Sequence, residues 1–177
     1  FQKIFKKKHK LLDDKFLFVG PGYNVRPTDL QAAIALNQFK RLKFFMKIRN
    51  QNKLKIVNSL KNHKKWKDQF KFVNVPKNIK PSWFGLPILI NKSSANVKQK
   101  FLQHLTNKNI ENRPIISGNF LNQPAAKLYK FKNIKKDFVN SEEIEKKGFF
   151  IGLHTKPITS KELNHLTTNL LKFDKFL

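Results

Sequence analysis

The sequence of 177 residues contains no cysteine. This absence excludes disulfide bonds, thiolate metal sites and a cysteine nucleophile. Acidic residues are scarce as well: 11 stand against 37 lysines and arginines, for a net charge of +26. Most of these acids fall on expected helix surfaces, so no carboxylate pair for acid–base catalysis is apparent. No apolar run reaches the roughly 18 residues that a membrane-spanning helix needs.

Standard catalytic and metal-binding motifs are missing from the sequence. With only six glycines, it has neither a glycine-rich phosphate loop nor a G-x-S-x-G motif. The histidines are scattered, at His9, His63, His104, His154 and His165. Their spacing does not match that of metal ligands, so we expect no metal site.

The chain begins with FQKIFKKKHK, which has neither an initiator methionine nor the apolar segment of a signal peptide. We therefore expect a fragment of a longer protein. Hydrophobic residues make up 40% of the chain and include 18 phenylalanines, which favours a packed core over disorder. The length suits one ordinary domain, with or without a small appendage.

The positive charge has two possible explanations. A strongly basic chain is typical of proteins that bind nucleic acid. However, the excess is almost entirely lysine, and lysine, asparagine, isoleucine and phenylalanine all have A/T-rich codons. The lysines are also dispersed, apart from clusters at residues 6–10 and 61–67. We favour a solvated surface, and a nucleic-acid-binding module remains the alternative.

Only four of the basic residues are arginines: Arg26, Arg41, Arg49 and Arg113. A guanidinium presents a planar fork of donors that fits carboxylate or phosphate, and lysine cannot imitate this fork. Arg113 lies in the polar stretch IENRPIISGNFLNQP, residues 110–124. This stretch is therefore a candidate for ligand binding.

The first regular element expected is a long helix. Thr28 and Gln31 match a capping box, and apolar residues at helical spacing continue to about residue 62, with a candidate break at residues 50–52. A helix of this length is a candidate for connecting domains or contacting another subunit.

Short strands and helices alternate after residue 62. The pattern predicts strands at 70–76, 82–91 and 149–154. It also predicts helices at 96–108, 123–131, 141–147 and 160–173, the last one beginning after Thr159. This order indicates a small α/β layer structure. We expect Trp83 and Phe84 to be core residues and His154 to be structural.

Two polar clusters stand at special places. Tyr23, Asn24 and Arg26 precede the N-terminus of the long helix, where backbone N–H groups favour an anion. The alternative is a loop that only caps the helix. In the second cluster, Arg113 and Asn119 stand with Ser117 and Gln123, which suits a phosphorylated or polyhydroxylated ligand as well as an ordinary turn.

The segment GYNVRPTDLQAAIALNQFKRL closely resembles G-Y-N-x-R-x-T-x-x-Q-A-A-x-x-x-x-Q-L-x-x-L of the DegT/StrS-type sugar aminotransferase family. SWFGLPILI, NIENRPIISGNFLNQP and GFFIGLHTKPITSKELNHL resemble later parts of that family in the right order. The resemblance implies the aspartate-aminotransferase fold, which is fold type I of pyridoxal-phosphate (PLP) enzymes. Residues 1–27 would end the large cofactor domain, 28–62 form a connecting helix, and 63–177 form the C-terminal small α/β domain.

The segment RPIISGN most resembles the nucleotide-sugar 3-dehydratase branch of the family, which acts in lipopolysaccharide and O-antigen sugar biosynthesis. Its members use pyridoxamine phosphate (PMP) to remove the C3 hydroxyl of a 4-keto-6-deoxyhexose. A histidine replaces their Schiff-base lysine, and that catalytic position would lie upstream of this chain. An aminotransferase of the same family remains an alternative.

The resemblance also implies roles for individual residues. Asn24 would reach across a dimer interface to the cofactor phosphate, and Arg26 would lie beside it, facing cofactor or substrate. Arg113 and Asn119 would contact the nucleotide sugar. The sequence departs from the family pattern at Pro27, where the family often has a larger residue. Proline is harmless in the first turn of a helix.

The resemblance further implies a cytoplasmic homodimer in the complete enzyme, with neither nucleic acid nor membrane as a partner. Without the large domain, we expect the 177 residues alone to be inactive. A non-catalytic interaction domain that dimerises through the long helix is a further alternative.

Overall fold

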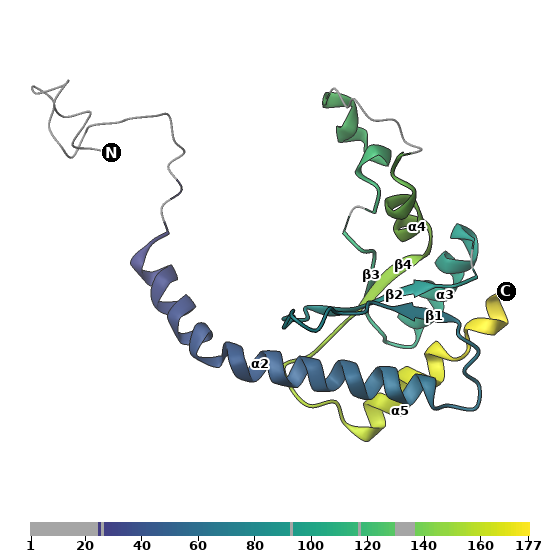
Figure 1. Cartoon of the computed structure of the whole chain (residues 1–177), viewed down its shortest axis with the longest axis horizontal. Coiled ribbons are helices and arrows are strands. Elements are labelled where there is room, and N and C mark those ends of the chain that lie inside the picture. Colours follow the sequence, from purple (N-terminus) through teal and green to yellow (C-terminus); the bar gives the residue numbers. More distant parts are fainter. Residues whose placement is uncertain (1–24, 26, 93, 117, 130–136) are drawn as a thin grey trace, which may run out of the picture. The chain divides into compact units, whose positions relative to one another are not determined.

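A computed structural model describes residues 25, 27–92, 94–116, 118–129 and 137–177 (Figure 1). The chain divides into two units, Phe1–Lys40 and Arg41–Leu177. Helix α2, Asp29–Lys61, begins in the first unit and ends in the second. All other described helices and strands belong to the second unit.

The predicted capping box at the start of α2 is confirmed. The backbone N–H of Thr28 donates to Oε1 of Gln31 at 2.9 Å, and the backbone N–H of Gln31 donates to Oγ1 of Thr28 at 3.3 Å. The helix then runs without the candidate break at residues 50–52. The asparagines that suggested a break instead use their side chains in contacts with other segments. Asn50, for example, donates to the carbonyl of Pro81 at 3.2 Å.

The second unit contains a four-stranded antiparallel sheet with the order β1-β2-β4-β3. Its strands are Phe70–Phe72 (β1), Gly85–Ile90 (β2), Asn112–Arg113 (β3) and Gly148–Gly152 (β4). The predicted strands at 70–76, 82–91 and 149–154 are confirmed as elements, although each is shorter than expected. The sequence does not predict strand β3, because its two residues lie within the polar stretch 110–124 and are too few to show a strand pattern.

Three of the four helices predicted after residue 62 are confirmed with small changes of their bounds. They are Ala95–Asn107 (α3), Val139–Lys147 (α4) and Ser160–Leu170 (α5). The predicted helix at 123–131 is replaced by two 3₁₀ turns, Phe120–Asn122 (η2) and Pro124–Leu128 (η3), and a third, Phe173–Phe176 (η5), follows α5. Ser94 caps α3, and Thr159 forms a full capping box with Glu162 at the start of α5.

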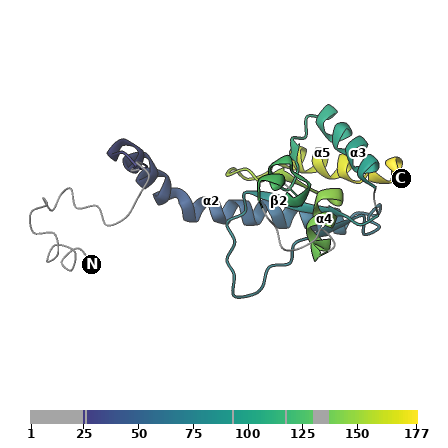
Figure 2. The ribbon, with the colours of Figure 1, turned by 90° about the horizontal axis from the view of Figure 1, so that it is seen from above.

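The core of the second unit lies where α2, α3 and α5 pack on the sheet (Figure 2). Helix α2 buries Ile48, Asn52, Ile56 and Leu60, spaced four residues apart. Phe101 of α3 lies at the centre, with its ring 5.1 Å from that of Phe173 and 6.0 Å from that of Phe70. This small sheet covered by helices confirms the predicted α/β class. Within the described residues, no helix is long and apolar enough to cross a membrane.

Candidate functional site

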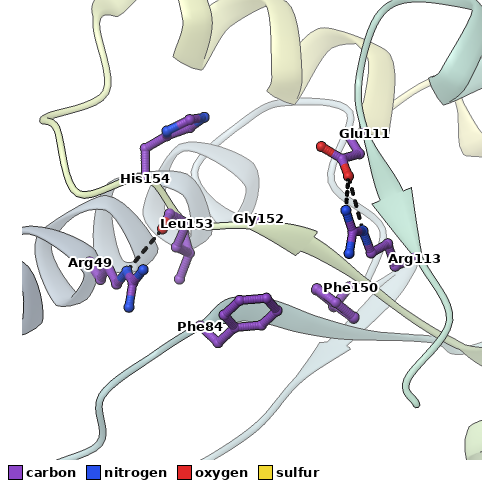
Figure 3. Close-up of a pocket in the computed structure, with 8 residues that line it drawn as sticks. All are labelled: Arg49, Phe84, Glu111, Arg113, Phe150, Gly152, Leu153 and His154. Carbon is purple, nitrogen blue, oxygen red and sulfur yellow. Dashed lines mark hydrogen bonds and ion pairs between the residues drawn. The ribbon is translucent and has the colours of Figure 1, made fainter. Parts of the chain in front are cut away.

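An open hollow of about 220 Å³ lies at the β3 edge of the sheet (Figure 3). Strands β3 and β4, the residue before β2 and helix α2 all contribute side chains. The lining residues are Arg49, Phe84, Glu111, Arg113, Phe150, Gly152, Leu153 and His154. All of them belong to the unit 41–177. The hollow therefore gathers segments from across that unit.

Arg113, which we predicted as a substrate contact, lies in this hollow. The structure holds its backbone by pairing β3 with β4, where Arg113 faces Phe150. Its side chain donates through Nε at 2.9 Å and Nη2 at 2.6 Å to the same carboxylate oxygen of Glu111. Both side chains are mostly exposed, at 62% for Arg113 and 75% for Glu111. The guanidinium is thus ordered without being removed from solvent.

Arg49 is a second arginine in the hollow, and the sequence did not indicate it. It lies on helix α2. Its Nε donates to the carbonyl of Leu153 at 3.2 Å, which fixes the guanidinium over the end of β4 (Figure 3). Two of the four arginines therefore line one hollow. Their scarcity in a lysine-rich chain was the signal that could have found Arg49.

Two phenylalanines form an apolar wall of the hollow. The rings of Phe84 and Phe150 lie 5.7 Å apart at 55°. Phe84 is 69% exposed, so our prediction that it is a core residue is wrong. Gly85 allows the contact, because a Cβ there would lie 2.5 Å from the Phe150 ring. Trp83, in contrast, packs against the core as predicted.

The turn after β4 is anchored to helix α2 by Asn52. This buried side chain donates to the carbonyls of His154 at 3.1 Å and Lys156 at 2.8 Å, and it accepts from the N–H of Ile158 at 2.9 Å. The carbonyl of His154 is thus part of this anchor, and a structural role for its side chain stays a prediction. Its exposed ring lines the hollow.

Asn119 is not among the residues lining the hollow. It is 2% exposed, and its Oδ1 accepts from the N–H of Leu121 while its Nδ2 donates to Glu142. These contacts hold a loop, and a role in substrate binding stays a prediction. Asn24 and Arg26, predicted to bind cofactor and substrate, lie outside the described residues, as does Ser117.

The carboxylate that Asn119 contacts is strongly stabilised in its charged form. Side-chain hydrogen bonds from Asn119, then Asn122, then Lys146 lower the pKa of Glu142 to about 2. A carboxylate that accepts several hydrogen bonds prefers to stay ionised. Among the residues that the structure describes, no group of three or more acids and histidines could hold a metal ion.

The donor set of the hollow suits an anionic, partly apolar ligand. Two guanidinium groups offer forked donors for phosphate oxygens. The Glu111 carboxylate can accept from a hydroxyl, and the exposed Phe84 ring offers a flat apolar face. A phosphorylated sugar or nucleotide combines all of these features.

Comparisons with known proteins identify the relatives of this chain. The DegT/DnrJ/EryC1/StrS aminotransferase family matches residues 2–170. GDP-4-keto-6-deoxy-D-mannose 3-dehydratase of Escherichia coli O55:H7 is 32% identical over 149 residues, which are 84% of this chain and 37% of that protein. The lipopolysaccharide biosynthesis protein RfbH of Salmonella typhimurium LT2 is 27% identical, over 93% of this chain and 36% of that protein.

A solved structure shows the same fold. The E. coli GDP-4-keto-6-deoxy-D-mannose-3-dehydratase with bound hydrated PLP superimposes with a TM-score of 0.76 at 30% identity. The match covers 89% of this chain and 39% of that one, so the chain spans well under half the length of these relatives. Since the family match covers nearly all of its residues, the chain belongs to the DegT/DnrJ/EryC1/StrS aminotransferase family.

Proposed function

We propose that this chain forms the C-terminal, substrate-binding part of a PLP- or PMP-dependent 3-dehydratase. Its substrate would be a nucleotide-linked 4-keto-6-deoxy sugar used in lipopolysaccharide biosynthesis. The observation that carries the proposal is the hollow lined by two arginines, Arg49 and Arg113, together with Glu111 and Phe84. Its support is that the matched relatives include a GDP-4-keto-6-deoxy-D-mannose 3-dehydratase and a lipopolysaccharide biosynthesis protein.

Each lining residue has a task in this proposal. Arg113 and Arg49 bind oxygens of the diphosphate, because a permanently charged fork forms strong hydrogen bonds with such anions. Glu111 already accepts from Arg113, and its second carboxylate oxygen remains to accept from a sugar hydroxyl. Phe84 covers an apolar face of the ligand and excludes water from that side. The chain thus binds and orients the sugar.

The cofactor supplies an electron sink for removing the C3 hydroxyl. Asn24 is the residue of this chain that would hold the cofactor phosphate, and Arg26 would lie beside it. Because both lie outside the described residues, the proposal for the cofactor is supported by the family and by the PLP bound in the E. coli relative. The catalytic base would come from another part of the enzyme.

A sugar aminotransferase is the alternative, since the family as a whole carries that name. The two activities leave different products from the same keto sugar. A dehydratase removes the C3 hydroxyl, whereas an aminotransferase places an amino group at C4. The sequence features most similar to the dehydratases lie in the Arg113 segment, which favours the first activity.

The test uses the protein expressed from its complete reading frame, with PLP and glutamate added. GDP- and dTDP-linked 4-keto-6-deoxyhexoses are incubated with it separately, and the products are identified by mass spectrometry and NMR. We expect a product that lacks the C3 hydroxyl. A 4-amino sugar would establish the aminotransferase instead, and unchanged substrate with both nucleotides would contradict the proposal.

The assembly and location of the complete enzyme follow from the same proposal. We propose a cytoplasmic homodimer in which Asn24 serves the site of the neighbouring subunit. Sedimentation of the complete protein at several concentrations measures its oligomeric state. A monomer at all concentrations would contradict the proposed homodimer.

A further inference from the structure

Two carboxylates of helix α4 hold the loop that follows Arg113. Oε2 of Glu145 accepts from the backbone N–H of Asn119 at 2.8 Å and from Nδ2 of Asn122 at 2.9 Å. Oε2 of Glu142 accepts from Nδ2 of Asn119 at 3.1 Å and from Nδ2 of Asn122 at 3.0 Å. We call Glu142 and Glu145 the carboxylate clamp.

Helix α4, which carries the clamp, is itself held by helix α3. Glu142 and Glu145 are three residues apart and therefore lie on one face of α4. Lys98 of α3 donates to the backbone carbonyls of Glu145 and Gly148 at the C-terminal end of that helix, where a cation is favourable. Hydrogen bonds from Asn119 and Asn122 also lower the pKa of Glu142, so this carboxylate stays ionised well into the acidic range.

The loop under the clamp is backbone-strained. Ile116 has a φ of 46° although it is β-branched, and its side chain is 89% exposed. Such a conformation is a genuine outlier for a β-branched residue, and it persists only where the surroundings impose it. Gly118 has a φ of 60° and lies so close to α4 that a Cβ would be 2.6 Å from Cβ of Glu145. The contacts of Gly118 and Asn119 with α4 therefore hold this part of the loop against the helix.

The loop held by the clamp follows in sequence from Arg113, which lines the hollow. Strand β3 pairs through only Asn112 and Arg113, so the ladder alone fixes Arg113 weakly. Ile115 packs directly beside Gly148, where α4 ends and β4 begins. The chain on the C-terminal side of Arg113 is thus held by Ile115 and then by the clamp. A loop released from α4 would let Arg113 move relative to Arg49.

We propose that Glu142 and Glu145 are positioning residues for Arg113, an inference that rests on the proposed function. They touch neither the hollow nor a ligand in it. They act by holding the strained loop, and this sets the direction in which the Arg113 fork meets the substrate. Loss of either carboxylate should weaken substrate binding and leave the chemical step unchanged, because Arg113 contacts a part of the substrate that does not react.

The experiment measures kcat and KM of the complete enzyme for its nucleotide sugar in Glu142→Ala and Glu145→Ala. We expect KM to rise about tenfold, since small misplacements of a binding group are costly, while kcat stays within about twofold. The matched control is Glu143→Ala. Glu143 lies on the same helix, where its carboxylate pairs with Lys147 at 3.0 Å, so KM should not change.

Two further variants distinguish a positioning effect on KM from a general folding defect. Glu145→Gln retains an oxygen acceptor and should restore most of the lost affinity. Gly118→Ala leaves both carboxylates in place but pushes the loop from α4, so it should raise KM like Glu145→Ala. Hydrogen exchange of the Asn119 amide, the donor to Glu145, should accelerate in Glu145→Ala and Gly118→Ala but not in Glu143→Ala.

The outcomes separate the two claims. A wild-type enzyme that converts no nucleotide sugar overturns the proposed function. A fully active wild type, with faster exchange at Asn119 but unchanged KM in the Glu145 and Gly118 variants, overturns the positioning role alone. Raised KM with normal kcat, together with recovery in Glu145→Gln, supports it.

Discussion

Arg113 and Glu111 are joined by two hydrogen bonds to one carboxylate oxygen, at 2.9 and 2.6 Å, on the rim of a hollow that Arg49 also lines. Both partners are more than half exposed, so the pair contributes about 0–1 kcal/mol to the free energy of unfolding. The ion pair matters instead for ligand binding. An incoming phosphate must share Arg113 with Glu111.

Replacing Glu111 should therefore tighten the binding of a simple anion. In Glu111→Gln the guanidinium of Arg113 loses its charged partner, and the local potential becomes more positive. We expect inorganic pyrophosphate to bind severalfold more tightly by calorimetry, with a change in the free energy of unfolding below about 1 kcal/mol. Glu143→Gln removes a comparable ion pair elsewhere and should leave pyrophosphate affinity unchanged. Weaker binding in Glu111→Gln would contradict this account of the pair.

Asn52 should be among the polar side chains most important for stability. In Asn52→Ala the carbonyls of His154 and Lys156 and the N–H of Ile158 lose their partner inside the protein. We expect a loss of about 3 kcal/mol in urea unfolding, since buried groups left unsatisfied cost about 1–3 kcal/mol each and some gain water. Asn58→Ala, an exposed site on the same helix, should cost less than about 0.5 kcal/mol. Equal losses in both variants would contradict the anchoring role.

Ile116→Gly tests the strain in the clamped loop. A left-handed conformation costs a residue with a side chain about 1–2 kcal/mol, whereas glycine adopts it freely and costs about 0.5–1 kcal/mol in chain entropy. With the side chain 89% exposed, little packing is lost. We expect the free energy of unfolding to rise by about 0.5 kcal/mol. Ile115→Gly, where the side chain packs beside Gly148, should instead destabilise the protein.

The lowered pKa of Glu142 predicts a pH dependence. Its pKa falls from 4.5 to about 2 on folding, because Asn119, Asn122 and Lys146 donate to the carboxylate. The folded state thus gains stability above about pH 4.5 and loses it as the pH falls towards 2. The difference in unfolding free energy between wild type and Glu142→Gln should have its maximum value at pH 6 and decrease steadily between pH 4.5 and 2. A difference that stays constant over this range would show that Glu142 is not stabilised as described.

Local sequence patterns predicted the elements but not how they meet. The capping box of Thr28 could be predicted because both partners lie within three residues. At Thr159 only the start of the helix was predicted, and the structure adds the capping box with Glu162. Strand β3 escaped prediction because two residues have no readable alternation, and their pairing depends on β4. Arg113 was found as a ligand candidate because a scarce arginine in a polar stretch needs no tertiary information.

The rest of the site depends on long-range contacts. Arg49 meets Leu153 across 104 residues of sequence, and nothing local to the helix indicates that contact. Phe84 was assigned to the core because aromatic residues near a strand usually are buried, but it lies just before β2 and faces the hollow. Asn119 looked like a ligand donor, while its contacts with α4 depend on a helix that begins 20 residues later.

The most direct test of the central claim compares Arg113→Lys with Arg41→Lys in the complete enzyme. Arg41 lies over the ring of Phe45, 4.7 Å from its centroid, and does not line the hollow, so it controls for losing one guanidinium. A charged hydrogen bond is worth about 1.5–3 kcal/mol, and lysine cannot reproduce the fork. The account predicts that kcat/KM for the nucleotide sugar falls by about 10- to 100-fold in Arg113→Lys and is unchanged in Arg41→Lys. Equal kcat/KM in the two variants would contradict it.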